Sequence, residues 1–237
     1  MERYRLADII AEIECRYDYS RRLLRDYRHE GEQEPDLKIN VTKEDVIKER
    51  EKAITKQPEE YLESIALYRK FCEKVLDFKI MLFHASAISF DNKAYLFTGP
   101  SGMGKSTHAG LWKERFGDSV KVINDDKPLL RILEDGIYAY GTPWDGKHRI
   151  STNMRARVAA ICVLQQSQTN EIVPMKSRDA YQVILNQTYR PGGRKQMEQI
   201  LGMADTLIKQ IPVYYMRCNL STEAARIAYE GMNGKRG

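Results

Sequence analysis

The chain has 237 residues, which corresponds to one or two domains at a typical domain length of about 150 residues. Hydrophobic residues make up 42% and charged residues 30%, a composition that excludes a disordered, fibrous or disulfide-stapled protein. The net charge of +5 arises from 38 basic and 33 acidic residues that are interspersed along the chain. Because no basic arm is formed, charge does not indicate a nucleic-acid partner.

The apolar runs are short, as at 80–83 and 158–164, whereas a membrane span needs roughly 20 residues. The first residues mix both charge signs before any apolar run, unlike a signal peptide. We therefore expect a cytoplasmic protein with no membrane partner. The cysteines are widely separated and lack metal-ligand spacing, so we expect reduced structural thiols. They are Cys15, Cys72, Cys162 and Cys218.

Residues 1–78 are charge-dense and poor in glycine, and we predict that they form a small N-terminal module, either α/β or helical. Thr42 precedes Lys43-Glu44-Asp45 in the manner of a helix N-cap, and Leu37 to Val41 alternate as in a short strand. Pro58 opens a segment with apolar residues at helical spacing, which predicts a helix over about 58–77. We place a domain boundary after residue 78, with a second domain at 79–237.

Short strand patterns and helical patterns follow one another in the second domain, which predicts an α/β fold. The runs 85–90 and 94–98 flank Asp91-Asn92-Lys93 and predict a hairpin. A helix is expected from Ser106 to the C-cap Gly117. The later expected elements are a strand at 120–124, a hairpin of 129–133 and 137–140, strands at 158–165 and 212–218, and a helix at 221–232. An amphipathic helix is predicted from the face formed by Met197, Ile200, Leu201, Ala204, Leu207 and Ile208.

The strongest motif is Gly-Pro-Ser-Gly-Met-Gly-Lys-Ser at residues 99–106, which matches the phosphate-loop pattern G-x-x-x-x-G-K-[ST] at every required position. Glycines let backbone N–H groups turn around an oxyanion, and the following helix adds its positive end. The alternative is a glycine-rich turn that only caps a helix, but the place between a predicted strand and helix favours phosphate binding. The expected nucleotide-binding residues are Gly99, Ser101, Gly102, Met103, Gly104, Lys105, Ser106 and Thr107.

Two adjacent carboxylates, Asp125 and Asp126, end an apolar strand, where ligands of open α/β sheets collect. With the Ser106 hydroxyl they predict a Mg²⁺ site, and one of them would accept the proton of an attacking hydroxyl. Which aspartate is the base stays open, and Lys105 would neutralise the phosphates. The alternative is a solvated turn.

His84 lies between apolar residues, where a structural histidine is more common than a catalytic one.

Two basic groups are candidates for substrate contacts, since guanidinium groups bind oxyanions in a planar fork. The first is Lys147, His148 and Arg149, and the second is Arg190 and Arg194, which flank glycines that suit a closing loop. A solvated basic turn and an ordinary connector are the alternatives.

Between residues 80 and 140, the order of histidine-bearing strand, turn, strand, phosphate loop, helix, strand and acid pair resembles the catalytic domain of HPr kinase/phosphorylase. That family shares its P-loop fold with phosphoenolpyruvate carboxykinase. The resemblance is carried by His84-Ala85-Ser86-Ala87-Ile88, Ser106-Thr107-His108, Leu111-Trp112, Asn124-Asp125-Asp126-Lys127-Pro128 and Gly141-Thr142-Pro143-Trp144. A further similarity is Arg190-Pro191-Gly192-Gly193-Arg194.

The resemblance implies Mg²⁺-dependent transfer of the γ-phosphoryl group of ATP to a hydroxyl, with one aspartate as base and His84 near the reacting groups. The acceptor would be a serine of a protein or peptide, or a small molecule, and the resemblance implies a homo-oligomer. The family's metal-binding glutamate has no counterpart in 140–147, where Asp145 is the nearest acid. Two alternatives therefore stay open, a nucleotide-binding regulatory module without transfer activity and a carboxykinase-like enzyme.

Overall fold

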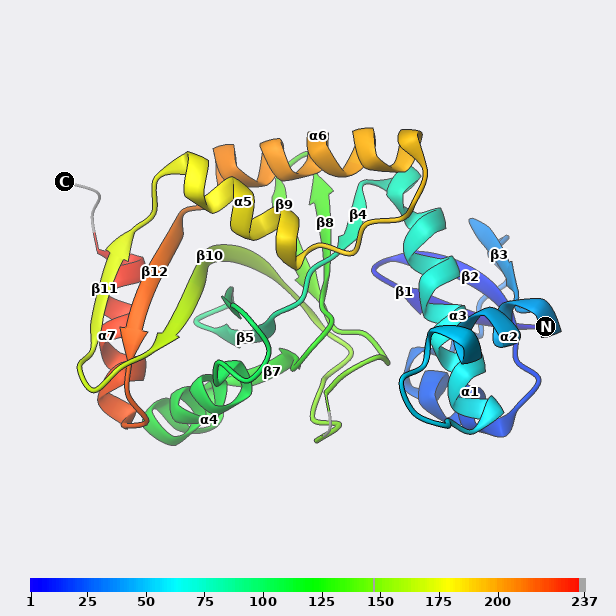
Figure 1. Ribbon diagram of the computed structural model, residues 1–237, viewed down its shortest axis with the longest axis horizontal. Coiled ribbons are helices and arrows are strands. Elements are labelled where there is room, and N and C mark those ends of the chain that lie inside the picture. The colour runs from blue at the N-terminus through cyan, green and yellow to red at the C-terminus, as the bar shows by residue number, and fades with distance from the viewer. Residues whose placement is uncertain (147, 235–237) are drawn as a thin grey trace. The chain divides into compact units, whose positions relative to one another are not determined.

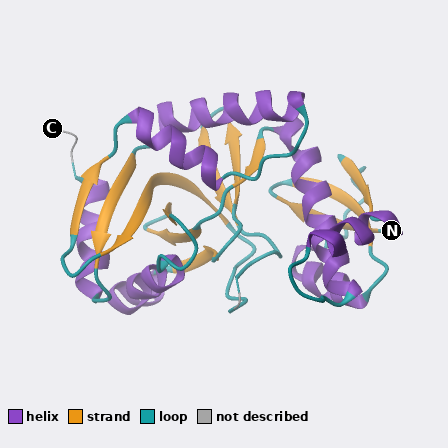
Figure 2. Cartoon of the chain, viewed as in Figure 1, coloured by secondary structure: helices purple, strands orange, loops and turns teal. Residues whose placement is uncertain are grey.

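The computed structural model describes residues 1–146 and 148–234 (Figure 1). The chain divides into two compact units, Met1–Asp77 and Phe78–Gly237. Helices and strands occur in both units, so the predicted α/β class is confirmed (Figure 2). None of the helices over the described residues is both long enough and apolar enough to cross a membrane.

The first unit has a three-stranded sheet in the order β1-β2-β3. Its elements are β1 (Glu2–Leu6), β2 (Ile9–Glu14), α1 (Asp18–Leu24), the 3-10 helix η1 (Arg25–Tyr27), β3 (Leu37–Asn40), α2 (Lys43–Lys52), α3 (Glu59–Lys74) and η2 (Val75–Phe78), which ends at the first residue of the second unit. The β1–β2 hairpin turns through Ala7 and Asp8, both with positive φ, and was not predicted because this turn lacks the usual Gly or Asn.

Local sequence explains where the helices of this unit begin. Thr42 and Asp45 form the expected capping box at the start of α2, and Pro58 caps α3. On α3, the fully buried Glu63 accepts hydrogen bonds from the Arg16 N–H (2.7 Å) and the Ser20 hydroxyl (2.6 Å). This carboxylate therefore fixes the chain at the first turn of α1.

The second unit contains a nine-stranded sheet and four α-helices over its described residues. Its elements are β4 (Ile80–Leu82), β5 (Ser86–Phe90), β6 (Lys93–Thr98), α4 (Lys105–Phe116), η3 (Gly117–Ser119), β7 (Lys121–Asn124), β8 (Leu129–Leu133), β9 (Gly136–Tyr140), β10 (Arg155–Gln166), β11 (Glu171–Pro174), α5 (Ser177–Gln187), α6 (Arg194–Gln210), β12 (Val213–Cys218) and α7 (Thr222–Asn233).

The long strand β10 organises this sheet, which runs β4-β8-β9-β10-β6-β5-β7 (Figure 1). One edge of β10 pairs in parallel with β6. Because Arg157 pairs with both β6 and β9, and Ile161 with both β6 and β12, the opposite edge carries β9 first and β12 farther along. The sheet curls along β10 as a result, and β11 pairs with the outer edge of β12.

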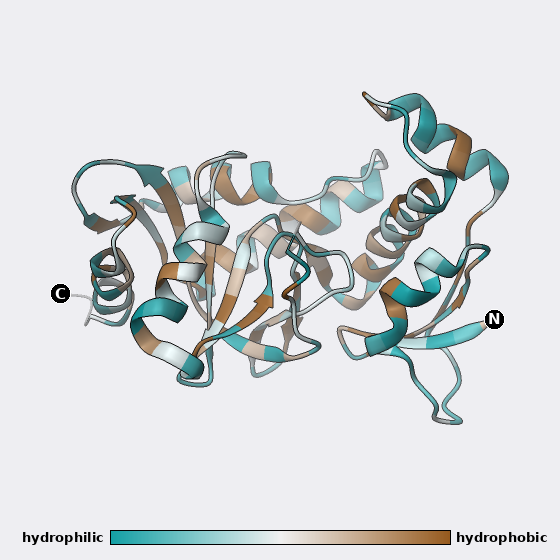
Figure 3. Ribbon diagram, turned by 90° about the horizontal axis from the view of Figure 1, so that it is seen from below, coloured by the Kyte–Doolittle hydropathy of each residue, from teal (hydrophilic) through white to brown (hydrophobic). Residues whose placement is uncertain are grey.

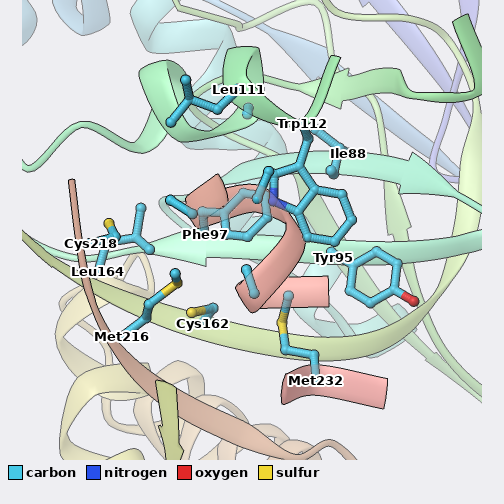
Figure 4. Close-up of a cluster of buried hydrophobic side chains, with 14 of the residues drawn as sticks. Ile88, Tyr95, Phe97, Leu111, Trp112, Cys162, Leu164, Met216, Cys218 and Met232 are labelled. Carbon is cyan, nitrogen blue, oxygen red and sulfur yellow. The ribbon is translucent and has the colours of Figure 1, made fainter. Parts of the chain in front are cut away.

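The core between the sheet and helices α4 and α7 is rich in aromatic and sulfur-bearing side chains (Figure 4). Trp112 of α4 is fully buried and lies 5.1 Å from Tyr95 and 5.5 Å from Phe97, both on β6, measured between ring centroids. Trp112 is therefore a core residue, as expected. All four cysteines are free thiols in buried positions, as the sequence predicted.

Helices α5 and α6 lie on the other side of the sheet from α4 (Figure 1). The helices carry hydrophobic and hydrophilic residues in alternation along their turns (Figure 3). The predicted buried face of α6 needs one correction: Leu201 is 38% exposed, whereas Met203 is buried. Ile200, Ala204 and Leu207 are buried as predicted, so the true face is rotated slightly toward Met203.

Candidate functional site

Strand directions bring three of the predicted segments to one edge of the sheet. β5 lies between β6 and β7 and is antiparallel to both. The carboxyl ends of β6 and β7 and the amino end of β5 therefore share one edge. The glycine loop follows β6, the acid pair follows β7, and His84 precedes β5.

The loop between β6 and α4 has the backbone that its glycines predict. Gly99, Gly102 and Gly104 have φ values of 141°, 80° and 91°, a region that L side chains rarely adopt. A Cβ at Gly99 would also lie 3.2 Å from the carbonyl oxygen of Leu164 on β10. Gln166, at the end of β10, donates to the Gly102 carbonyl over 3.2 Å, so β10 supports the loop from one side.

Lys105 begins α4 and is buried, with its ammonium group turned back into the loop. Its Nζ donates to the carbonyl oxygens of Gly99 (3.1 Å) and Pro100 (3.2 Å). Burial lowers the pKa of Lys105, and the charges of Asp126 and Asp125 partly oppose this change. The ammonium group thus lies within the electrostatic reach of both aspartates.

The other loop residues are more accessible. Ser101 and Gly102 are exposed, and Met103 and Gly104 are half-buried. Ser106 and Thr107 are exposed on the first turn of α4. Exposed amides and hydroxyls at a helix N-terminus form an arrangement that can receive an anion.

Asn124 shapes the turn that carries the two aspartates. Its side-chain oxygen accepts hydrogen bonds from the N–H groups of Asp126 (2.9 Å) and Lys127 (2.5 Å). Its amide nitrogen donates to Thr142 Oγ1 (2.9 Å). The buried Asn124 therefore ties the acid turn to the segment after β9.

The two aspartates have different surroundings. Asp125 is buried, and its Oδ1 accepts a hydrogen bond from Ser86 Oγ on β5. Its Oδ2 lies against Gly146, where a Cβ would be 3.1 Å away. Asp126 accepts from both His84 and Lys127. Burial alone would raise the pKa of Asp126, but these two partners outweigh it and lower the pKa to about 2.

His84 is held from two sides. Its Nε2 lies 3.1 Å from Asp126 Oδ1, and its Nδ1 lies 3.1 Å from Gln187 Oε1 at the end of α5. Its carbonyl oxygen accepts a hydrogen bond from Thr98 Oγ1 (2.8 Å), the residue before the glycine loop. The structure therefore brings His84 into direct contact with Asp126 and connects it to the start of the loop.

The predicted basic residues lie in two segments that follow the acid pair along the chain. Lys147 lies outside the described residues. His148 and Arg149 are exposed, and the Arg149 N–H donates to the Gly146 carbonyl (3.2 Å). Arg194 pairs with Glu198 on α6 (3.0 Å). Arg190 is exposed. Two residues before it, Thr188 forms an antiparallel bridge with Phe83, the residue before His84. Because the two segments are antiparallel, the chain after Thr188 runs away from His84.

The three residues predicted to bind Mg²⁺ carry the type of ligand atom that this ion prefers. Ser106, Asp125 and Asp126 offer only oxygen atoms, the ligand type that Mg²⁺ prefers. Over 1–146 and 148–234 there is no group of three or more His, Cys, Asp and Glu side chains that could hold a metal ion. These residues fit Mg²⁺ that is shared with phosphate oxygens and water, and they do not form an all-protein cage.

Four residues at the site were not predicted as functional: Ser86, Asn124, Thr142 and Gln187. Asn124 has a local signal, because an Asn before Asp-Asp-Lys suits a side-chain-capped turn. Gln187 has none, because 103 residues separate it from His84.

The model of the family described as "SynChlorMet cassette protein ScmC" matches residues 52–225. No curated protein matches. Among solved structures, the Hpr(Ser) kinase/phosphatase from Coxiella burnetii is similar at 13% identity and a TM-score of 0.38, over 65% of this chain and 99% of that chain.

Proposed function

The chain belongs to the ScmC family of SynChlorMet cassette proteins, and we propose that it is an ATP- and Mg²⁺-dependent kinase that transfers the γ-phosphoryl group to a hydroxyl. The proposal rests on one observation: the Gly99–Ser106 loop, the Asp125–Asp126 turn and His84 share one edge of the sheet. The order of these motifs along the chain, which resembles that of HPr kinases, supports it. The acceptor we propose is a serine of a protein or peptide, or a small hydroxyl compound.

In this proposal the loop acts as a P-loop. Backbone amides from Gly102 to Ser106 would surround the phosphates, and the Lys105 ammonium would leave the carbonyls of Gly99 and Pro100 for the β- and γ-phosphate oxygens. Exchanging two neutral acceptors for charged ones favours this movement. Thr107 and Met103 complete the loop.

The acid turn would supply metal ligands and the general base. Mg²⁺, when bound by Ser106 and the carboxylates, neutralises charge on the transferring phosphoryl group. One aspartate would accept the proton of the acceptor hydroxyl, and His84 would hold Asp126 in place while it does so. Lys147, His148, Arg149, Arg190 and Arg194 are proposed contacts of the acceptor or of the phosphoryl group.

Binding and transfer can be tested separately. Titration calorimetry with Mg·ATP measures nucleotide binding to the parent protein, Asp125→Asn and Asp126→Asn. Incubation with γ-³²P-ATP and an extract of the source cells then measures transfer to an acceptor. We expect both variants to bind Mg·ATP and at least one to lose labelling by a factor of about 10² or more.

The outcomes separate the alternatives. A parent protein that does not bind Mg·ATP contradicts the proposal entirely. Binding without labelling of any acceptor indicates a regulatory module. Oxaloacetate-dependent release of CO₂ in the presence of nucleotide indicates a carboxykinase-like enzyme.

A further inference from the structure

We propose that Gln187 is a positioning residue that holds the His84 ring against Asp126. Two hydrogen bonds connect the residues: the His84 N–H donates to the Gln187 carbonyl oxygen over 2.7 Å, and His84 Nδ1 lies 3.1 Å from Gln187 Oε1. One residue therefore fixes both the backbone and the side chain of His84. Its role in turnover rests on the kinase function proposed above, whereas its effect on the ring does not.

Gln187 is itself held in place by the chain on both sides. Before it, α5 buries Ala180 and Ile184. After it, Thr188 bridges to Phe83, and the Thr188 hydroxyl donates to the Ile184 carbonyl (2.8 Å). The Tyr189 N–H also donates to the Leu82 carbonyl (3.2 Å). The end of α5 is thus attached to the segment that leads into His84.

The opposite nitrogen of the ring faces the acid turn. Asp126 is a carboxylate that only accepts hydrogen bonds, so the His84 Nε2 that lies 3.1 Å from its Oδ1 must carry a hydrogen. The remaining ring nitrogen, Nδ1, donates a hydrogen bond if it carries a hydrogen and accepts one if it does not, and it needs a partner for that role. A glutamine amide can supply an acceptor oxygen or, after rotation by 180°, a donor NH₂ group.

Asp126 contacts His84 and Lys127, and its position depends on both. The backbone around the ring is also fixed, because the Ala85 N–H donates to the Asp126 carbonyl over 3.3 Å. The side chain of His84, however, is 38% exposed. Without Gln187, solvent would compete for Nδ1 and the ring could rotate away from Asp126. Gln187 is the group that prevents this rotation.

The first experiment is independent of catalysis. Long-range ¹H–¹⁵N spectra, recorded without metal or nucleotide at neutral pH, report which nitrogen of each histidine carries hydrogen. The spectrum of a His84→Asn variant assigns the His84 signals by their loss. In the parent protein we expect separate Nδ1 and Nε2 signals, with the hydrogen on Nε2. In Gln187→Leu we expect the two signals to move toward each other.

Gln182→Leu is the matched control, because Gln182 is exposed on the same helix. It should leave the His84 signals unchanged. If Gln187→Leu does not fold, Gln187→Met takes its place, since it keeps the length of the side chain and removes the amide. His84 signals that are the same in the parent and in the folded Gln187 variant overturn the proposal.

The second experiment measures steady-state hydrolysis of Mg·ATP. We expect Gln187→Leu to lower kcat about tenfold with an unchanged KM for Mg·ATP. Equal kcat values in the parent and Gln187→Leu contradict the role in turnover. If the parent itself does not hydrolyse ATP, the labelling experiment above decides the kinase function, and the ring signals alone decide the role of Gln187.

Discussion

Asn124 Nδ2 donates a hydrogen bond to Thr142 Oγ1 over 2.9 Å, and this contact joins the acid turn after β7 to the chain that follows β9. The Thr142 hydroxyl also lies 3.0 Å from the Lys127 carbonyl oxygen, so the contact belongs to a network around the turn. Both residues are almost fully buried. Solvent therefore cannot replace these partners when one of them is removed.

Asn124→Ala should lower the free energy of unfolding by about 2–3 kcal/mol, because it leaves buried polar groups without partners. Urea unfolding followed by circular dichroism measures this value. Asn186→Ala, at an exposed position of α5, is the control and should change it by less than about 0.5 kcal/mol. Equal midpoints and slopes for the two variants would show that the Asn124 network does not stabilise the fold.

Lys105→Met should weaken binding of Mg·ATP at least tenfold, because the variant keeps the buried stem and removes the charge that would meet the phosphates. The loop carbonyls of Gly99 and Pro100 lose a donor, but the fold should remain. Lys113→Met, at an exposed position of the same helix, should bind as the parent does. Calorimetry checks both variants, and an unchanged Kd for Lys105→Met would remove the loop from the nucleotide site.

His108 should make the protein less stable in mild acid. Burial lowers the pKa of His108 from 6.5 to about 4. The unfolded chain therefore binds a proton between these pH values while the folded protein does not, so this stability is complete above about pH 6.5 and is lost as the pH falls toward 4. The shift corresponds to about 3 kcal/mol at most.

Urea unfolding at several pH values between 7 and 4, without nucleotide or metal, measures this effect. His108→Gln keeps an acceptor for the Trp112 Nε1–H group, which donates to His108 Nε2 over 3.2 Å, and should flatten the dependence on pH. His148→Gln, at an exposed position, should not. The same pH dependence in the parent and His108→Gln would contradict the prediction.

Gly141→Ala should destabilise the protein by more than about 2 kcal/mol, since close-packed backbone leaves no room for a methyl group. A Cβ there would lie 2.0 Å from the Thr152 carbonyl oxygen and 2.8 Å from that of Ile123. Gly202→Ala is the matched control, because nothing lies within 4 Å of its Cβ on α6. It should stabilise the protein by roughly 0.5–1 kcal/mol. Thermal unfolding compares the two, and a small effect at Gly141 would show that the segment at Thr152 can move away.

The elements that sequence reasoning predicted are those with local signals. The hairpin of β5 and β6 follows from the turn at Asp91 and Asn92, which both have positive φ, and α4 ends at Gly117 as expected. The β1–β2 hairpin, β11 and α5 were missed. The turn of the β1–β2 hairpin and the strand pattern of β11 are weak, and tertiary packing determines these two elements instead.

In the candidate site too, contiguous motifs could be predicted from the sequence, whereas contacts between distant segments could not. The glycine loop and the acid pair are visible in the sequence because each is contiguous. Their approach to one another depends on strand directions, and the contact between His84 and Gln187 depends on the attachment of α5 to the segment before β5. No pattern within either segment indicates that contact.

The β5–β6 hairpin has a consequence for insertions and deletions. Its register is continuous from Phe90 opposite Lys93 to Ser86 opposite Phe97, and it keeps His84 and Gly99 at the same end. One residue added within either strand would turn all later side chains to the opposite face, so Phe97 would lose Trp112. Within this hairpin, changes in chain length can therefore be accommodated at the turn of Asp91 and Asn92, which lies at the other end from His84 and Gly99. A fluorescent label or a fused peptide inserted between β5 and β6 belongs at that turn.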